Sequence, residues 1–460
     1  MTNKQFINMI VSLFCVLLTI FIIANSFKPY GKMWLLPLTY MIVFIIFWRF
    51  KNGRQLFSSK GDFLFKVAVT IRYLIIPALI IVNGSAHYGF GSYVGIEKYD
   101  YAILYMAYEL FIVSLVYYLL ERRKKLVISL ESRITQKNSV LLYKILIVIG
   151  VILLGIPEVR NRYTFFASSI VMTSREIISS YEGSYNLLFY LANYAKIAIP
   201  IVILVYFNRK YSSNPKTSYV MMSIIGTMIP NFFYIATSRN SIFLPMLASF
   251  FTMLAIFYKH RRMLYTIYGT AIVSIVGMMT WLKSLAGSAN VTLDWLTNYL
   301  SIYFLGPKEY AIGLTSIETY NRNVTLNTFV NDMIGNIPGL SSFADLLDRT
   351  SQYYNWTYYG GSHIGIGGGY IVPSSIQGAF HFGYLLGPLM VIIALYTIRR
   401  SEHLMKKNSM NISTVYIANY AMSAAAFFYA NSISSLLNLL FFIIVPMLVI
   451  NFVQRVLFRK

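Results

Sequence analysis

Charged residues are scarce in this 460-residue chain, at 12%, whereas 57% of its residues are hydrophobic. The apolar residues form runs of about 17 to 22 nearly uncharged residues, the length that a membrane-spanning helix needs. A soluble core does not require such runs, but a helix that crosses about 30 Å of hydrocarbon does. The sequence therefore predicts an all-α polytopic membrane protein.

Cysteine is almost absent, and so are the patterns that bind metals. The single Cys15 lies in the first apolar run, which excludes an intrachain disulfide and a metal site built from cysteines. The chain has no D-x-D, no H-x-x-x-H and no cluster of histidines with carboxylates at helical spacing. We therefore expect no metal and no cofactor, so cationic side chains and backbone dipoles would have to stabilise any leaving group.

Twelve apolar runs are each long enough to cross a bilayer. The first is too long for the apolar part of a signal peptide and lacks a small-residue cleavage site, so we expect it to remain as an anchor. The sequence thus predicts about twelve transmembrane helices. They are centred on residues 6–27, 33–48, 63–84, 101–120, 139–156, 186–207, 218–236, 241–258, 264–282, 376–397, 413–430 and 434–453.

Acidic residues are few, and the chain carries a net charge of +23. Most of the 39 Lys and Arg residues lie in short loops between alternate apolar runs. The positive-inside rule makes these loops cytoplasmic, and both termini with them. Topology and contact with anionic lipid explain the charge, so we expect a lipid bilayer as partner and no nucleic acid.

Two of the predicted connections are long. Residues 157–185 form an outer loop of moderate length, and residues 283–374 form a much larger one; loops beyond about 12 to 15 residues are usually functional or disordered. The large loop contains aromatic residues such as Trp295 and Trp356, which are material for a folded, membrane-apposed cap. The sequence thus predicts three parts: transmembrane helices one to nine in 1–282, an extracytoplasmic loop domain in 283–374, and helices ten to twelve in 375–460.

Arginines on the outer face need an explanation, because the topology rule leaves few basic residues there. Arg239 would lie in the first turn of the eighth helix, after Thr237 or Ser238 as the cap. Exposed N–H groups, the helix dipole and the guanidinium would then converge on an anion such as phosphate. The alternative is that Arg239 reaches to lipid headgroups.

Arg322 and Arg349 are the two arginines of the large loop. An arginine can hold a diphosphate through several oxygens, so we predict that both bind one. Each also has a carboxylate close in the sequence, Glu318 and Asp348, and could form an ion pair with it instead.

The large loop ends in the stretch YYGGSHIGIGGGYIVPSS, which places six glycines around His363. Glycine permits positive φ and close backbone approach, so this segment can fold tightly around a ligand or act as a gate. An imidazole can donate a proton to a leaving group or accept one from a hydroxyl. His363 is therefore a candidate catalytic residue, with simple solvation as the alternative.

Ionisable residues elsewhere are weaker candidates. Arg160, Arg162 and Arg175 lie in the moderate outer loop, where ion pairing is the default and substrate contact the alternative. Within the predicted spans, Arg72, Glu109 and Lys196 could form buried pairs or line a groove for lipid headgroups. Their partners do not follow from the sequence.

Three stretches resemble one known family. They are TSRNSIFLP after Ala236, PKEYAIGLTSIETY with the later NIPGL, and SHIGIGGGYIVPSSIQGAFHFGYLLGPL. In this order, and with one dominant outer loop, they resemble the bacterial oligosaccharide repeat-unit polymerases of the Wzy type, which make O-antigen, capsule and common-antigen polysaccharides and are related to O-antigen ligases.

The resemblance implies a GT-C-like, metal-independent glycosyltransferase in the bacterial cytoplasmic membrane, with its active site on the extracytoplasmic side. Its substrate would be an undecaprenyl diphosphate-linked oligosaccharide, and a chain-length regulator and a flippase would be partners. Arg239, Glu309 and His363 match the motifs best, and Arg349 matches more loosely. Glu309 or His363 would accept the proton of the attacking sugar hydroxyl, and aromatic residues such as Tyr370 would contact the sugars.

Three other functions stay open at this point. A ligase would attach the same glycan to another acceptor. A flippase or exporter of lipid-linked glycan would suit twelve spans and buried charges, although its critical residues should then lie in the membrane. A non-catalytic receptor or scaffold would need none of the proposed site residues.

Overall fold

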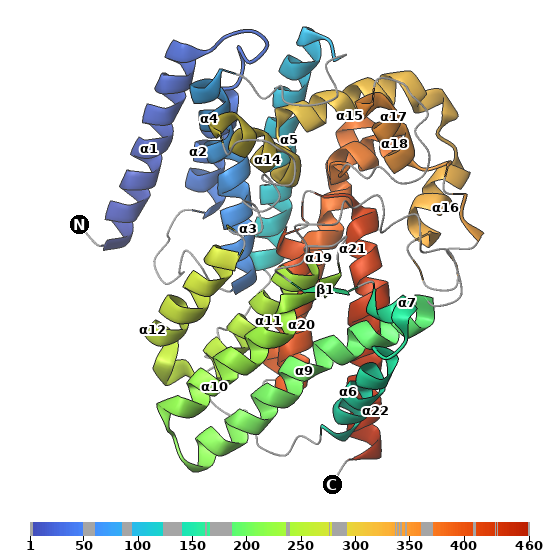
Figure 1. The fold of residues 1–460 in the computed structure, drawn as a ribbon. Helices are drawn as coiled ribbons and strands as arrows, with labels where there is room; N and C mark the ends of the chain where they lie inside the picture. The colour runs from blue at the N-terminus through green and yellow to red at the C-terminus, as the bar shows by residue number, and fades with distance from the viewer. Residues whose placement is uncertain are drawn as a thin grey trace. The chain divides into compact units, whose positions relative to one another are not determined.

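A computed structural model shows a helical protein with one short strand pair (Figure 1). The structure describes residues 3–48, 60–84, 94–122, 140–161, 163–165, 186–235, 240–275, 277, 292–335, 337, 340, 343–345, 347–359, 371–407, 411–427, 429 and 431–458. The strand pair joins β1 (Tyr163–Phe165) and β2 (Phe233–Ile235) as antiparallel neighbours, with Thr164 opposite Tyr234.

The predicted class, a helical membrane protein, is confirmed. By length and composition, six of the described helices could cross a membrane, and a pair bent by 108°, Ile242–Ile256 with Tyr258–Ile275, would be a seventh. The six are Asn8–Asn25, Lys60–Asn83, Ile96–Leu120, Leu187–Ser213, Ser374–Met405 and Ile433–Leu457. Among the other predicted runs, Leu35–Trp48 and Leu141–Leu153 are shorter apolar helices, and the run 218–236 is helical only up to Phe232 and continues into β2. The count of twelve crossings stays a prediction.

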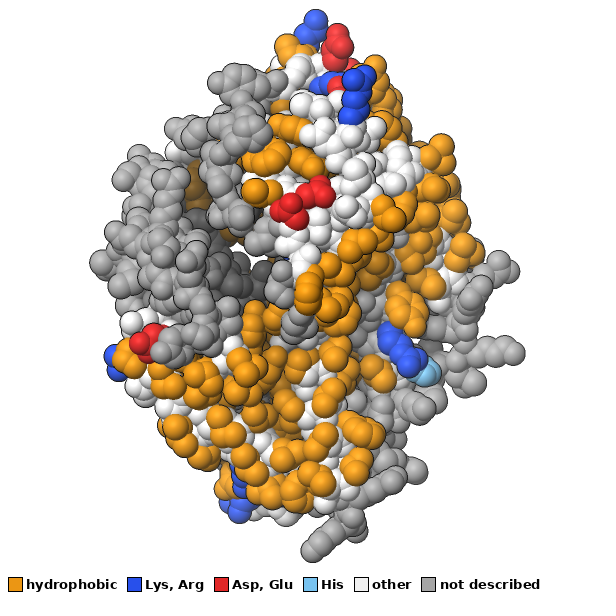
Figure 2. All heavy atoms as spheres, turned by 90° about the vertical axis from the view of Figure 1, so that its right-hand side faces the viewer, with side chains coloured by type: hydrophobic (Ala, Val, Ile, Leu, Met, Phe, Trp, Pro, Cys, Tyr) orange, Lys and Arg blue, Asp and Glu red, His pale blue; other side chains and the backbone are white. Residues whose placement is uncertain are grey.

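Large apolar side chains cover much of the surface. Leu187, Val273 and Ile152 are about 70% exposed, which is unfavourable in water and expected against lipid. Figure 2 shows a face on which hydrophobic side chains predominate and charged ones are few. Both observations fit helices that turn an apolar side to hydrocarbon.

The chain divides into two compact units. The first comprises Met1–Leu126, Val291–Arg399 and Ala425–Asn438. Its elements are α1 (Asn3–Asn25), α2 (Leu35–Val43), η1 (Phe44–Trp48), α3 (Lys60–Thr70), η2 (Ile71–Ile75), α4 (Ile76–Asn83), α5 (Ile96–Arg122), α14 (Leu293–Phe304), α15 (Pro307–Tyr320), η6 (Asn321–Asn323), α16 (Leu326–Ile334), α17 (Thr350–Tyr358), α18 (Ser374–Leu386), η8 (Gly387–Met390), the start of α19 (Val391–Lys407), and α21 (Ile433–Leu439).

The second unit comprises Val127–Asn290, Arg400–Ala424 and Leu439–Lys460. Besides the strand pair it contains α6 (Leu141–Leu153), α7 (Pro157–Arg160), α9 (Asn186–Ser213), α10 (Thr217–Met228), η3 (Ile229–Phe232), α11 (Asn240–Ile256), η4 (Tyr258–His260), α12 (Arg261–Met263), η5 (Leu264–Gly269), most of α20 (Ile412–Phe427), η9 (Leu440–Ile444) and α22 (Val445–Leu457).

Helices from the predicted large loop belong to the first unit, where they pack on membrane helices. Helix α14 contacts α4, and α15 contacts α5, α17 and α18. Sequence signals set the helix starts: Pro307 begins α15, and a capping box between Thr325 and Thr328 begins α16. The loop is thus a folded helical layer, at least over the described residues.

Helix α18 does not run straight into α19. Gly383 has φ +77° and ψ 168°, which only glycine adopts readily, and the chain turns back there. A Cβ on Gly378 would lie 2.2 Å from the Gly387 carbonyl oxygen, although nine residues of straight helix would separate them by about 13.5 Å. The predicted tenth span, 376–397, is therefore broken, and its first part packs against its continuation.

Candidate functional site

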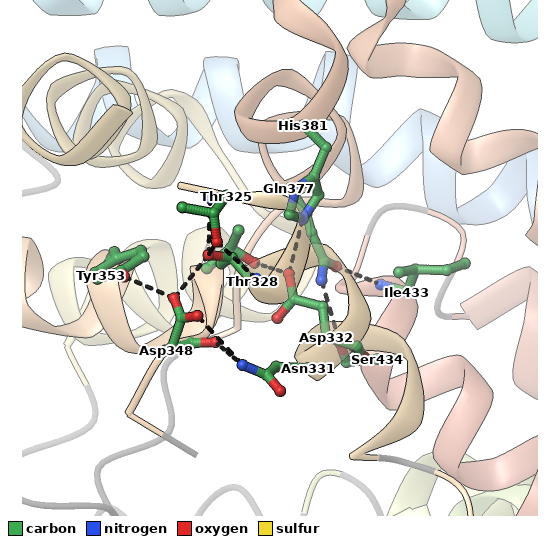
Figure 3. Close-up of polar contacts among 11 residues, drawn as sticks. Thr325, Thr328, Asn331, Asp332, Asp348, Tyr353, Gln377, His381, Ile433 and Ser434 are labelled. Atoms are coloured by element: carbon green, nitrogen blue, oxygen red, sulfur yellow. Dashed lines mark hydrogen bonds and ion pairs between the residues drawn. The ribbon is translucent and has the colours of Figure 1, made fainter. Parts of the chain in front are cut away.

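A carboxylate, an imidazole and a hydroxyl meet between α16, α17 and α18 in the first unit. Asp332 Oδ2 accepts hydrogen bonds from His381 Nε2 at 2.9 Å and from Thr350 Oγ1 at 2.5 Å. Figure 3 shows the Asp332 and His381 side chains pointing toward one another. Both are almost fully buried. Because a carboxylate oxygen accepts, Nε2 is the donor in this bond, and in that tautomer Nδ1 is the nitrogen left to accept a hydrogen.

The neighbouring Asp348 holds this cluster together. Its Oδ1 accepts hydrogen bonds from Thr328 Oγ1 at 2.7 Å and from Tyr353 Oη at 2.9 Å (Figure 3). Asn331 Nδ2 donates to the Asp348 carbonyl oxygen at 3.1 Å. The carboxylate thus ties α16 to the start of α17. It is not the partner that the sequence suggested for Arg349.

Arg349 is the N-cap residue of α17, and its guanidinium lies against Gly335 at the end of α16. Its Nε and Nη2 are buried, yet neither has a hydrogen-bond partner among the residues that the structure describes. Burial lowers the pKa of Arg349, and the nearby Asp332 and Asp345 oppose that shift. Arginine remains charged, and its two unused donors near Asp332 make Arg349 a candidate for binding an anion.

Glu309 lies in the first turn of α15 and is buried. Ser301 Oγ donates to its Oε2 at 2.8 Å, whereas Oε1 has no hydrogen-bond partner within the described part of the chain. Burial raises the pKa of Glu309, and the adjacent Lys308 partly opposes this. Burial in turn lowers the pKa of Lys308. A carboxyl group in this setting keeps its proton to higher pH and can exchange it with a substrate.

The raised pKa of Glu309 predicts a pH-dependent stability. A carboxyl whose pKa is higher in the folded state than in the unfolded one costs stability once it ionises, so the penalty begins near pH 4.5 and grows up to the raised pKa. We expect Glu309→Gln to lessen the fall in melting temperature between about pH 4.5 and the raised pKa. Thermal unfolding in detergent at several pH values measures this. Identical profiles of melting temperature against pH for both proteins would show that folding does not raise the pKa of Glu309.

A second buried cluster surrounds Glu109, near the middle of α5. Its carboxylate forms an ion pair with Arg72 at 2.9 Å and accepts a hydrogen bond from Ser375 Oγ at 2.6 Å and another from the Tyr310 hydroxyl. Arg72 lies in the π-helical η2 and donates from Nε to the Leu305 carbonyl oxygen at 3.0 Å. Of the two alternatives that the sequence left for Arg72 and Glu109, the structure shows a buried pair, in which each is the other's partner. Its contacts join η2 and α5 to α15, to α18 and to Leu305 at the end of α14.

The remaining predicted residues fall into two groups. Arg322 is exposed on η6, and its suggested partner Glu318 instead forms an ion pair with Lys98. Arg160 is exposed on α7 in the second unit. Arg239, His363, Arg162, Arg175 and Tyr370 lie outside the described residues. Of the predicted site, the structure thus places Arg349 and Glu309 in polar surroundings and leaves Arg322 in solvent.

His381 was missed by the sequence analysis. It lies within a predicted span, where an ionisable residue is itself a signal of function, and that signal could have found it. Its partner Asp332 is 49 residues away. Only the fold shows that the two are in contact.

Among the described residues, no group of three or more His, Cys, Asp or Glu side chains could hold a metal ion. No protein-family model, no curated protein and no solved structure matches the chain.

Proposed function

We propose that this protein polymerises undecaprenyl diphosphate-linked oligosaccharide repeat units at the outer face of the bacterial cytoplasmic membrane. The observation that carries the proposal is the Arg349 guanidinium near Asp332, whose Nε and Nη2 are buried and have no hydrogen-bond partner among the described residues. Arginine is suited to a diphosphate because its planar fork meets several phosphate oxygens.

The reaction would need two groups with opposite tasks. A sugar hydroxyl attacks the anomeric carbon, the bond from that carbon to the diphosphate oxygen breaks, and the diphosphate leaves with the electron pair. Arg349 would stabilise the charge that develops on the diphosphate. His381, oriented by Asp332, would take the hydroxyl proton at Nδ1; Glu309 and His363 are the alternative bases.

The proposal includes a topology. About twelve helices would cross the membrane with both termini in the cytoplasm, and 283–374 would lie outside. Support comes from the short basic loops, which all favour one side. The proposed diphosphate site would then face the compartment in which surface polysaccharides are assembled.

An assay with purified protein tests this function. Undecaprenyl diphosphate-linked repeat units are supplied as the only glycan, and the products are separated by size. We expect a ladder of lengthening chains without any other acceptor. Product only after addition of a different acceptor would indicate a ligase.

A flippase or exporter of the same lipid is the second candidate. The buried Arg72–Glu109 pair favours it, because charges inside membrane helices often mark transport pathways. Movement of the lipid across vesicles without chain growth would identify this activity. Such a result would also mean that Arg349 has no role in a chemical step.

A further inference from the structure

A groove of about 390 Å³ lies between α5, α15 and the residues that follow Gly383. We call it the tyrosine groove. Its wall is formed by Tyr101, Leu104, Tyr105, Tyr108, Leu314 and Tyr384.

The sequence of α5 explains the wall. Residues 101, 104, 105 and 108 repeat at helical spacing and therefore share one face. Tyr105 Oη donates to the Ser375 carbonyl oxygen at 3.1 Å, and Tyr108 Oη donates to that of Leu385 at 2.8 Å. With these hydroxyls engaged by the backbone, the two rings remain as apolar lining.

The turn at Gly383 closes one side of the groove. It returns the chain toward α5, where the Tyr384 ring packs edge-on against Tyr105 at 6.1 Å. A Cβ on Gly387 would lie 2.2 Å from the Tyr105 hydroxyl, so this close approach requires glycine. The groove is thus a consequence of the broken helix.

The groove opens onto a surface suited to lipid. Tyr101 is 59% exposed and Leu385 76%, and α5 contains one of the six helices long enough to span a membrane. The Lys98–Glu318 ion pair also borders the groove, near the start of α5 and the end of α15. Charged residues near a helix end belong at the headgroup level, with the apolar wall in the hydrocarbon.

We propose that the tyrosine groove holds the hydrocarbon chain of the lipid-linked donor. The same elements build both places: α18 carries His381 just before Gly383 and Tyr384 just after it, and α15 carries Glu309 and Leu314. The proposal therefore assigns the lipid chain and two of the candidate reacting groups to the same two helices, α15 and α18. The volume of the groove is at the lower end of the range for ligand pockets, so the groove can hold part of a hydrocarbon chain but not a whole lipid. This inference rests on the proposed function.

Binding of two diphosphates to the purified full chain tests it. The probes are undecaprenyl diphosphate and inorganic diphosphate, which has no hydrocarbon chain, both without sugars. We expect Leu104→Trp, which fills the groove, to weaken undecaprenyl diphosphate binding about tenfold because it displaces buried chain, and to leave inorganic diphosphate binding unchanged. Leu119→Trp is the matched control, since Leu119 is exposed on α5 outside the groove, and it should change neither affinity.

Other outcomes separate the two proposals. If Leu104→Trp binds undecaprenyl diphosphate as tightly as the unaltered protein, the groove proposal is overturned but the proposed function stands. Should Leu104→Trp fail to fold, the milder Leu104→Phe is measured in its place, and unchanged binding has the same meaning. If excess phosphatidylglycerol competes for the groove as well as undecaprenyl diphosphate does, the groove proposal is also overturned, because the occupant would then be bulk lipid. If the unaltered protein binds neither diphosphate, the proposed function fails first and the inference fails with it.

Discussion

Arg349→Ala should lower the rate of chain growth by about 10² to 10³-fold, the usual loss when one donor to a developing anion is removed. Two of its buried nitrogens have no hydrogen-bond partner in the described part of the protein, so the fold does not depend on bonds from them. Asp332 keeps its bonds from His381 and Thr350. The rate is measured in the ladder assay at equal protein concentration, beside the melting temperature.

Two companion variants separate geometry from charge. Arg349→Lys keeps the charge but loses the planar fork, so we expect it to recover little of the rate. Arg261→Ala removes an exposed arginine from α12 and should leave the rate unchanged. A rate for Arg349→Ala within a few-fold of the unaltered protein, at normal abundance, would remove Arg349 from the mechanism.

Gly335→Ala should produce a similar loss without touching the arginine. A Cβ there would lie 1.4 Å from Arg349 Nη2 and 2.8 Å from the Asn331 carbonyl oxygen, so the guanidinium must move. The backbone at Gly335 has φ −63°, which alanine adopts without strain. Gly269→Ala is the control, because nothing lies within 4 Å of its added Cβ. Full activity of Gly335→Ala would show that the position of the guanidinium does not matter.

The sequence predicted the membrane class because hydrophobic runs report directly on burial in hydrocarbon. It could not predict which charges meet. Arg72 and Glu109 are 37 residues apart, and Tyr310 reaches Glu109 across 201 residues. Such contacts depend on helix packing, which a one-dimensional pattern does not contain.

Local proximity was misleading in the large loop. Glu318 lies four residues before Arg322 but forms its ion pair with Lys98 on α5. Asp348 adjoins Arg349 but accepts hydrogen bonds from Thr328 and other neighbours. In both cases tertiary packing outweighs an exposed local pair, which contributes little free energy.

The turn at Gly383 was also beyond the sequence analysis. The run 376–397 contains no Asp, Glu, Lys or Arg and is long enough for one span, so the sequence indicates a single crossing. A glycine within a helix is tolerated, so Gly383 alone does not mark a reversal. The turn became visible through its positive φ and through the contact between Gly378 and Gly387.

Arg72→Met should destabilise the protein by about 3 to 5 kcal/mol, because it leaves Glu109 as a buried charge without its counter-ion. Both side chains are at most 1% exposed, so water cannot replace the lost partner. Tyr310 and Ser375 still donate to Glu109, but hydroxyl groups do not neutralise its charge. Thermal and denaturant unfolding in detergent, together with abundance in the membrane, measure the loss.

The double variant Arg72→Met with Glu109→Leu identifies the cause. If an uncompensated charge is responsible, the double variant should be more stable than Arg72→Met alone, since replacing both members of a buried pair often costs little. The exposed pair Lys32–Asp100, at 3.2 Å, is the matched control, and Lys32→Met should cost less than about 1 kcal/mol. Equal stability of Arg72→Met and Lys32→Met would show that the Arg72–Glu109 pair does not hold the loop helices to the membrane helices.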